Sequence, residues 1–178
     1  MRFLTTAVLA FVGVFVSGCA GLEEAPESER TFERIMEAPG ASKDRIFEST
    51  KIWIAQNFRS AKAVLEYENK PEGRIIGNGA IDYPCAGMEC LGKGSWKVQF
   101  TMQVDIKEQK FKLTFSNLTL SVPPTYNSAF YSSAFGVQSG FERPVWQKGD
   151  LNSIRPALLK FGDQLVASIQ NTKARENW

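Results

Sequence analysis

The middle of the chain carries one long run in which apolar and polar residues alternate. From Trp96 to Ile106 every second residue is apolar, and polar or charged residues stand between them. A period of two over this length is typical of a β-strand that buries one face and leaves the other in water. Because such a strand needs paired neighbours, the chain must build a sheet with one covered face and one solvated face.

Other segments of the chain predict the strands that pair with this one. The last of them changes its apolar phase near Ser116 and Asn117, which predicts a bulge, because a slip of one residue turns side chains to the other face. Turn residues such as the run from Asn69 to Gly73 separate the segments. The predicted strands are residues 31–36, 63–68, 74–83, 95–107 and 111–122.

Two segments have the apolar spacing of amphipathic helices. Residues 43–58 follow Ser42, a good N-cap, and residues 150–172 repeat the pattern near the end of the chain. Pro156 fits the first turn if Ser153 is the N-cap; the alternative is a helix that starts earlier and is kinked.

Together these segments predict an α+β fold in the order β-α-β-β-β-β-α. One antiparallel sheet would carry two helices on one face. Gly77 and Gly79 share a strand face with Ile75 and Ile81, so we expect them to leave room for a packed helix. The alternative is that they line a cleft between sheet and helix.

The N-terminus has the features of an export signal. Arg2 precedes an apolar run that ends at Val16, and the run is too short to span a bilayer comfortably. The sequence Ser17-Gly18-Cys19 that follows resembles the lipobox of bacterial lipoproteins. This predicts a signal peptide at 1–18 and lipid such as palmitate on Cys19; the alternative is an ordinary signal peptide with an incidental cysteine. Ala20 favours the outer membrane, facing the periplasm.

Removal of Cys19 from the count leaves Cys85 and Cys90 as the other two cysteines. In an oxidising periplasm we expect them to form a structural disulfide that closes a small loop. Free thiols, a redox pair or a metal pair are the alternatives. The pair has four intervening residues, whereas a redox Cys-x-x-Cys motif has two, and a metal would need further soft ligands.

The mature chain is predicted to form one domain at 31–172, preceded by a flexible tether at 19–30 and followed by a polar tail at 173–178. Residues 123–149 show no sustained period and predict a long loop. This loop is rich in aromatic residues, which are enriched at interface cores, and is our candidate interface. Its candidate residues are Tyr126, Phe130, Tyr131, Phe135, Phe141 and Trp146. The alternative is that the loop folds back on its own domain.

The chain has no histidine, so catalytic sites that need an imidazole are excluded within it. Asp82, Glu89 and Asp105 are the remaining carboxylate candidates, and their spacing shows no acid/base pair. We therefore expect no enzyme, no cofactor and no metal. The net charge of +2 comes from scattered basic residues, which argues against nucleic-acid binding.

Several segments resemble the DUF4468 family, a domain of unknown function with a TBP-like fold. The resemblance covers about residues 32–122 and includes Trp53-Ile54 with Asn57-Phe58, and the run from Ile75 to Gly79. It implies a TBP-like topology and an exported, often lipidated protein, and it carries over no catalytic residue. The sequence thus predicts an envelope lipoprotein that binds another protein or serves as a scaffold. The alternatives are a small-molecule or lipid binder and, third, an enzyme.

Overall fold

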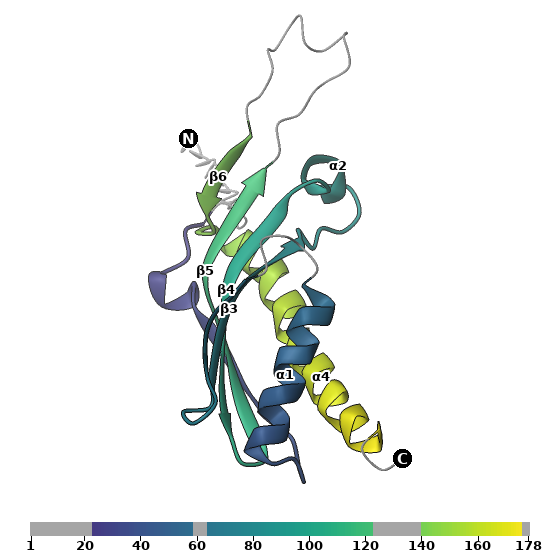
Figure 1. Ribbon diagram of the computed structural model, residues 1–178. Helices are drawn as coiled ribbons and strands as arrows, with labels where there is room; N and C mark the ends of the chain where they lie inside the picture. Colours follow the sequence, from purple (N-terminus) through teal and green to yellow (C-terminus); the bar gives the residue numbers. More distant parts are fainter. Residues whose placement is uncertain (1–22, 59–63, 123–139, 176–178) are drawn as a thin grey trace, which may run out of the picture.

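We obtained a computed structural model of the chain, which describes residues 23–58, 64–122 and 140–175. Its strands and long helices follow the predicted order, with η1, α2 and β6 as additions (Figure 1). In chain order they are η1 (Glu27–Glu29), β1 (Phe32–Glu37), α1 (Lys43–Asn57), β2 (Val64–Asn69), β3 (Arg74–Asp82), α2 (Glu89–Lys93), β4 (Lys97–Lys107), β5 (Lys110–Val122), β6 (Phe141–Pro144) and α4 (Lys148–Arg175).

The strands of the described part form one antiparallel sheet of six strands, in the order β1-β5-β4-β3-β2. Strand β6 pairs with the second half of β5, on the same edge that β1 occupies along the first half. Strand β5 therefore has β4 on one side and two short strands, one after the other, on its other side.

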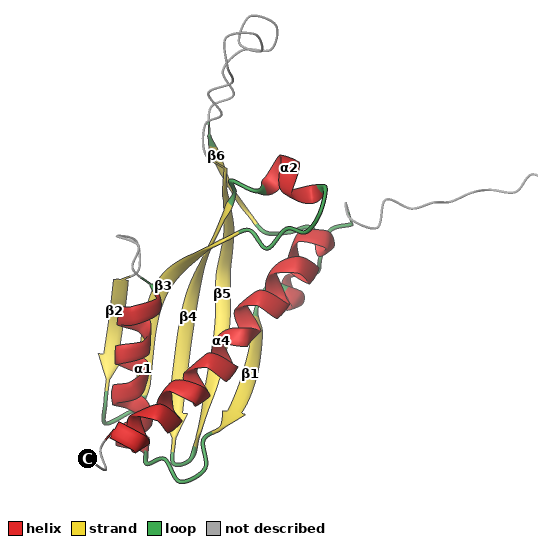
Figure 2. Cartoon of the chain, turned by 90° about the vertical axis from the view of Figure 1, so that its right-hand side faces the viewer, coloured by secondary structure: helices red, strands yellow, loops and turns green. Residues whose placement is uncertain are grey.

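Both long helices lie on one face of the sheet. Figure 2 shows α4 crossing the strands diagonally with α1 beside it. The opposite face, here called the open face, carries neither of these helices in the described part of the chain (Figure 1). The predicted α+β class and the two helices on one antiparallel sheet are confirmed.

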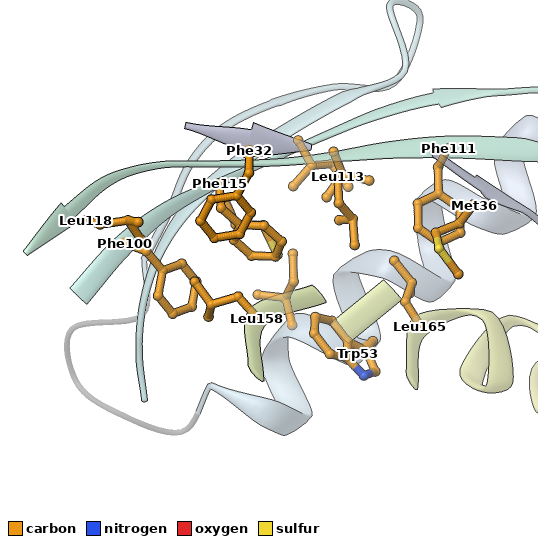
Figure 3. Packing of buried hydrophobic residues seen from close by; sticks show 14 of the residues in the cluster. Phe32, Met36, Trp53, Phe100, Phe111, Leu113, Phe115, Leu118, Leu158 and Leu165 are labelled. Atoms are coloured by element: carbon orange, nitrogen blue, oxygen red, sulfur yellow. The ribbon is translucent and has the colours of Figure 1, made fainter. Parts of the chain in front are cut away.

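The core fills the space between the sheet and the helices (Figure 3). The alternation that predicted β4 is confirmed, because Val98, Phe100, Met102, Val104 and Ile106 are all buried. Helix α4 approaches β1 so closely that a Cβ on Gly162 would lie 2.9 Å from the sulfur of Met36. Rows of apolar residues on the two layers meet there, which accounts for the fold's stability.

Two local predictions are also confirmed. The Ser42 side chain accepts a hydrogen bond from the backbone N–H of Arg45 at the start of α1. The pairing of β4 with β5 shifts register opposite Phe100, and Asn117 has a positive φ of 52° there. This bulge returns Leu118 and Leu120 to the core face.

Three boundaries differ from the prediction. Residues 141–144, near the end of the predicted 123–149 loop, form β6, which pairs with β5. Four residues are too few to show an alternating pattern that would predict this strand. Helix α4 starts at Lys148, so Pro156 lies inside it and Ser153 is not its N-cap; the alternative of an earlier start is the one found. The same helix continues to Arg175, into the predicted tail.

The described part of the predicted tether, residues 23–30, is docked on the domain. Ala25 is fully buried, and its N–H donates to the carbonyl of Trp146 over 2.7 Å. The guanidinium of Arg30 donates to the carbonyl of Ala25. Residues 23–30 are therefore docked beside the start of α4, where the Glu23–Lys148 ion pair and the bond from Arg155 to the Glu29 carbonyl add to these contacts.

Candidate functional site

The two ends of the sheet differ in chemistry and are described in turn. At one end, here called the disulfide end, lie α2, β6 and the first turn of α4 (Figure 2). At the other, here called the hairpin end, the turn between β4 and β5 lies beside the start of α1, held by backbone hydrogen bonds between Gln109 and residues Ala38 and Ala41.

A disulfide lies in the loop between β3 and β4, which carries α2. Cys85 and Cys90 are bonded, with their Cα atoms 5.1 Å apart, so the predicted disulfide is confirmed. Helix α2 within this loop presents Met88 and Leu91 to solvent, 85% and 87% exposed. The loop thus has a covalently closed base and an apolar tip.

A buried carboxylate joins this loop to helix α4. Asp150, only 1% exposed, accepts hydrogen bonds from the Tyr83 hydroxyl and the Lys93 ammonium, both over 2.8 Å. The Arg143 guanidinium donates to its other oxygen over 2.9 Å. The Lys93 ammonium also bonds to Glu89 and lies 4.6 Å from the centre of the Tyr83 ring. One buried anion therefore connects β3, α2, β6 and α4.

The protonation of this network follows from its contacts. Burial would raise the pKa of Asp150, but hydrogen bonds from Lys93 and Tyr83, with the charge of Lys93, lower it below the usual value. Burial, opposed in part by the Lys93 contact and reinforced by Asp150, raises the pKa of Tyr83 to about 12. At neutral pH Tyr83 is therefore a hydrogen-bond donor and Asp150 an anion. We call Asp150 together with Tyr83, Lys93 and Arg143 the Asp150 latch, because these contacts hold the surrounding elements together.

The three carboxylates considered as catalytic candidates are bonded to three different cations. Glu89 pairs with Lys93 at the disulfide end, Asp82 with Lys97, and Asp105 with Arg74. In the residues that the structure describes, no group of three or more Cys, Asp or Glu side chains could hold a metal ion. The three candidates thus form no common site.

The predicted aromatic interface is described only in part. Tyr126, Phe130, Tyr131 and Phe135 lie outside the described residues, as does Cys19. Phe141 is 46% exposed and packs edge-on against Trp96, with ring centres 6.3 Å apart. Trp146 is half-buried, and the Arg143 guanidinium lies 5.7 Å from the centre of its ring. Both described members belong to the disulfide end.

The hairpin end carries a hollow of about 770 Å³, here called the hairpin hollow. Ile35 of β1, 63% exposed, lies in it, in register with Lys112 of β5, which in turn pairs with Asp105 of β4. The lining residues are Ile35, Lys43, Glu72, Arg74, Asp105, Ile106, Lys107, Glu108, Lys110, Phe111 and Lys112. An exposed apolar side chain thus stands in a concave, predominantly basic surface.

The cations around the hairpin hollow are not all neutralised. Arg74 pairs with Asp105 and Glu72, and Lys112 pairs with Glu33. Lys107 and Lys110 are exposed and make no ion pair with any residue that the structure describes. Lys43, whose ammonium donates to the carbonyl of Pro71, makes no such ion pair either. The hollow that contains Ile35 therefore keeps positive charge that no described ion pair neutralises.

The middle of the open face has a different character. A second hollow, of about 420 Å³, is lined by amide and hydroxyl side chains. The Thr101 hydroxyl donates to Asn78 over 2.8 Å and accepts from the Asn117 amide over 3.2 Å. These side chains satisfy one another, which is the ordinary state of a solvated sheet face.

The space between sheet and helices is filled where Gly79 lies. A Cβ on Gly79 would stand 2.7 Å from the Phe100 ring and 3.2 Å from the Phe58 ring. Phe58 and Phe100 pack edge-on, with ring centres 5.9 Å apart. Gly79 therefore makes room for packed rings, and among the described residues this position lines no sheet/helix cleft.

Comparison with known proteins identifies the family to which this chain belongs. A family model described as a domain of unknown function (DUF4468) with TBP-like fold matches residues 32–121, about half of the chain. The chain belongs to the DUF4468 family. The matched stretch runs from the start of β1 almost to the end of β5 and so includes the hairpin hollow, whereas β6 and α4 follow it.

Two solved structures resemble this DUF4468 chain in fold. A TBP-like protein from Parabacteroides distasonis shares 10% identity with a TM-score of 0.54, covering 79% of this chain and 92% of that one. A DUF4468 family protein from Bacteroides ovatus shares 12% identity with a TM-score of 0.49, covering 83% and 88%. No curated protein matches the chain. The comparisons establish family and fold, and they name no ligand.

Sequence reasoning missed the Asp150 latch and the hairpin hollow. Tyr83 and Asp150 are 67 positions apart, and neither stands in a recognisable motif. The exposure of Ile35 could not be predicted, because a six-residue strand shows too few alternations of apolar and polar residues to indicate which side is buried. The only sequence signal for the latch was an aspartate in the first turn of a helix.

Proposed function

We propose that this DUF4468 protein is a non-enzymatic binding domain held at an envelope membrane by lipid on Cys19. Its ligand would be a segment of a partner protein that carries acidic and apolar side chains, and it would bind in the hairpin hollow. The observation that carries the proposal is the position of two unpaired lysines, Lys107 and Lys110, beside the exposed Ile35.

The chemistry of the hairpin hollow supports this ligand. One exposed isoleucine alone is ordinary on a protein surface. Here it stands in a concavity, where a bound apolar side chain would be shielded from water. Carboxylates of the same ligand would meet Lys107 and Lys110, and complementary charge favours both encounter and choice of partner.

The geometry of the whole domain supports membrane attachment at the opposite end. Glu23, the first described residue, pairs with Lys148 at the start of α4, which belongs to the disulfide end. Strand β4 has 11 residues and runs the length of the sheet, which corresponds to about 35 Å. A domain attached through Cys19 would therefore present the hairpin hollow away from the membrane.

The bonded state of the carboxylates supports a non-enzymatic role. Asp82, Glu89 and Asp105 each bond to a lysine or arginine. The contact with Lys93 lowers the pKa of Glu89, and although burial would raise the pKa of Asp105, its contact with Arg74 lowers it. A general base near neutral pH needs a raised pKa instead. Alanine at Asp82 or Glu89, which do not line the hairpin hollow, should leave any phenotype of the protein unchanged. Loss of a phenotype in a variant that still folds would revive the enzyme hypothesis.

A peptide titration tests the hairpin hollow directly. The probe is a synthetic peptide of alternating glutamate and leucine, added to the isotopically labelled domain and followed by NMR. We expect shifts concentrated at Ile35 and Lys110, and affinity that falls as salt is added. Lys107→Glu with Lys110→Glu should weaken binding at least about tenfold, the effect of losing roughly 1.4 kcal/mol.

A matched pair of charge reversals elsewhere serves as the control. Lys51 and Lys160 lie on α1 and α4, away from the hairpin hollow, and their reversal changes the net charge equally. This control should bind as the unmodified domain does. Equal loss in both double variants, or shifts spread over the whole open face, would show non-specific charge attraction and overturn the proposal.

A further inference from the structure

The disulfide end presents two large apolar side chains that nothing in the described part of the chain covers. Met88 and Leu91 are three positions apart at α2, so they share one side of its single turn. They are the most exposed large apolar side chains among the described residues. We propose that they contact the lipid surface to which the chain is anchored and so orient the domain upright on it.

The loop that carries these residues is fixed at its base. The Cys85–Cys90 bond closes a ring that contains Met88, and Leu91 follows Cys90 directly. The Lys93 ammonium, two residues further on, bonds to Asp150 of α4 over 2.8 Å. Cys85 also packs against the hydrophobic core. The apolar pair is therefore presented by a rigid element, so its insertion would cost little ordering entropy.

The place where the chain enters the domain identifies the lipid surface as the occupant. Three residues separate Cys19 from Glu23, which allows a reach of about 14 Å when extended. Glu23 pairs with Lys148, two positions before Asp150, which holds Lys93 of α2. The anchored cysteine would thus keep α2 within a short distance of the bilayer. This step rests on the proposed lipidation of Cys19.

The charges of this end suit an apolar contact. Glu23 pairs with Lys148, Glu89 with Lys93, and Asp82 with Lys97. Because the ions neutralise one another locally, few unpaired charges would lose water at the bilayer surface. The contact would come from buried apolar area, so it should depend little on salt or on anionic lipid.

Methionine oxidation measures this contact without a label. Met88 is the one exposed methionine of the described residues, whereas Met36 and Met102 are buried and serve as internal references. Dilute peroxide converts an exposed methionine to the sulfoxide, which peptide mass spectrometry locates. The experiment compares the lipidated full-length protein on phosphatidylcholine vesicles with the mature chain lacking lipid, free of vesicles.

We expect Met88 to be oxidised at least about fivefold more slowly on vesicles than in the free chain, with Met36 and Met102 unchanged. Leu91→Asp in the anchored protein should restore the fast rate. Ile52→Asp, at a 49% exposed residue of α1, is the matched control and should leave Met88 protected.

Three outcomes would overturn the inference. Equal oxidation of Met88 on and off vesicles would show that α2 stays in water. Slow oxidation in the vesicle-free chain would show that another part of the protein covers Met88. Protection that survives Leu91→Asp would show a cause other than apolar insertion. The mass of the Cys19 peptide is measured on the same sample, so absence of lipid would refute the anchor separately.

Discussion

The Tyr83 hydroxyl donates a hydrogen bond to the buried carboxylate of Asp150 over 2.8 Å. Tyr83 directly follows β3 and Asp150 lies in the first turn of α4, so this hydrogen bond joins two elements that are distant in the sequence. Lys93 and Arg143 neutralise the same carboxylate. The stability of the disulfide end therefore depends on the charge state of one group.

Replacement of Asp150 should make this dependence measurable. Asp150→Asn leaves Lys93 and Arg143 without their anion and should lower the free energy of unfolding by about 3 kcal/mol at pH 7. Because the folded pKa of Asp150 is lowered, its contribution is present above the unfolded pKa of about 3.9 and is lost as the pH falls through the folded value. Urea unfolding at several pH values measures both the loss of unfolding free energy at pH 7 and its dependence on pH.

The exposed Asp82 provides the control for that series. It pairs with Lys97 in water, so Asp82→Asn should change stability by less than about 1 kcal/mol. A difference between unmodified protein and Asp150→Asn that stayed constant from pH 7 to pH 2 would contradict the latch.

Tyr83 sets the alkaline limit of the same latch. Its pKa is raised to about 12, so the stability that it contributes is present below the unfolded pKa of about 10 and is lost as the pH rises through about 12. In the protein labelled with carbon-13 in tyrosine, the Tyr83 ring signal should titrate last. Tyr83→Phe should remove that signal; titration of the assigned Tyr83 signal near pH 10 would contradict the hydrogen-bonded geometry.

Loss of the disulfide should destabilise the domain moderately. For so short a loop, chain entropy in the unfolded state gives about 2 kcal/mol for Cys85→Ser with Cys90→Ser. A reducing agent should lower the unmodified protein to the stability of the double variant and leave the variant itself unchanged. Insensitivity of the unmodified protein to reductant would mean that the thiols are free.

Alanine substitution at two glycines distinguishes the cost of overpacking from the effect on backbone entropy. A Cβ on Gly79 would meet the Phe100 ring at 2.7 Å, so Gly79→Ala should cost about 1–3 kcal/mol. A Cβ on Gly92 in α2 would meet nothing within 4 Å, so Gly92→Ala should be neutral or stabilise by up to about 1 kcal/mol. Thermal unfolding of both variants checks the pair, and equal effects would refute the packing account.

The sheet and helices could be predicted because the periodic spacing of their apolar residues extends over many residues. The alternation from Trp96 to Ile106 fixes which face of β4 is buried, and the phase change after Phe115 locates the bulge from the residue pattern alone. Ser42 likewise marks the start of α1. Local chemistry determines each of these features.

The functional surfaces could not be predicted because they depend on distant parts of the chain. Phe141 to Pro144 become a strand only because the second half of β5 offers a free edge. The exposure of Ile35 depends on its register opposite Lys112, and Asp150 is neutralised by Lys93 of α2 and Arg143 of β6. Tertiary pairing, rather than local preference, decides these positions.

The central claim is that the two ends of the domain have separate tasks, and site-specific photo-crosslinking in cells tests it most directly. A photoreactive residue is placed at Ile35 or at Leu91 in the full-length chain. We expect position 35 to form a discrete adduct with a protein, crosslinked through an acidic peptide of that protein. Charge reversal at Lys107 and Lys110 should abolish this adduct. Position 91 should form an adduct with lipid. A protein adduct from position 91 with none from position 35 would contradict it.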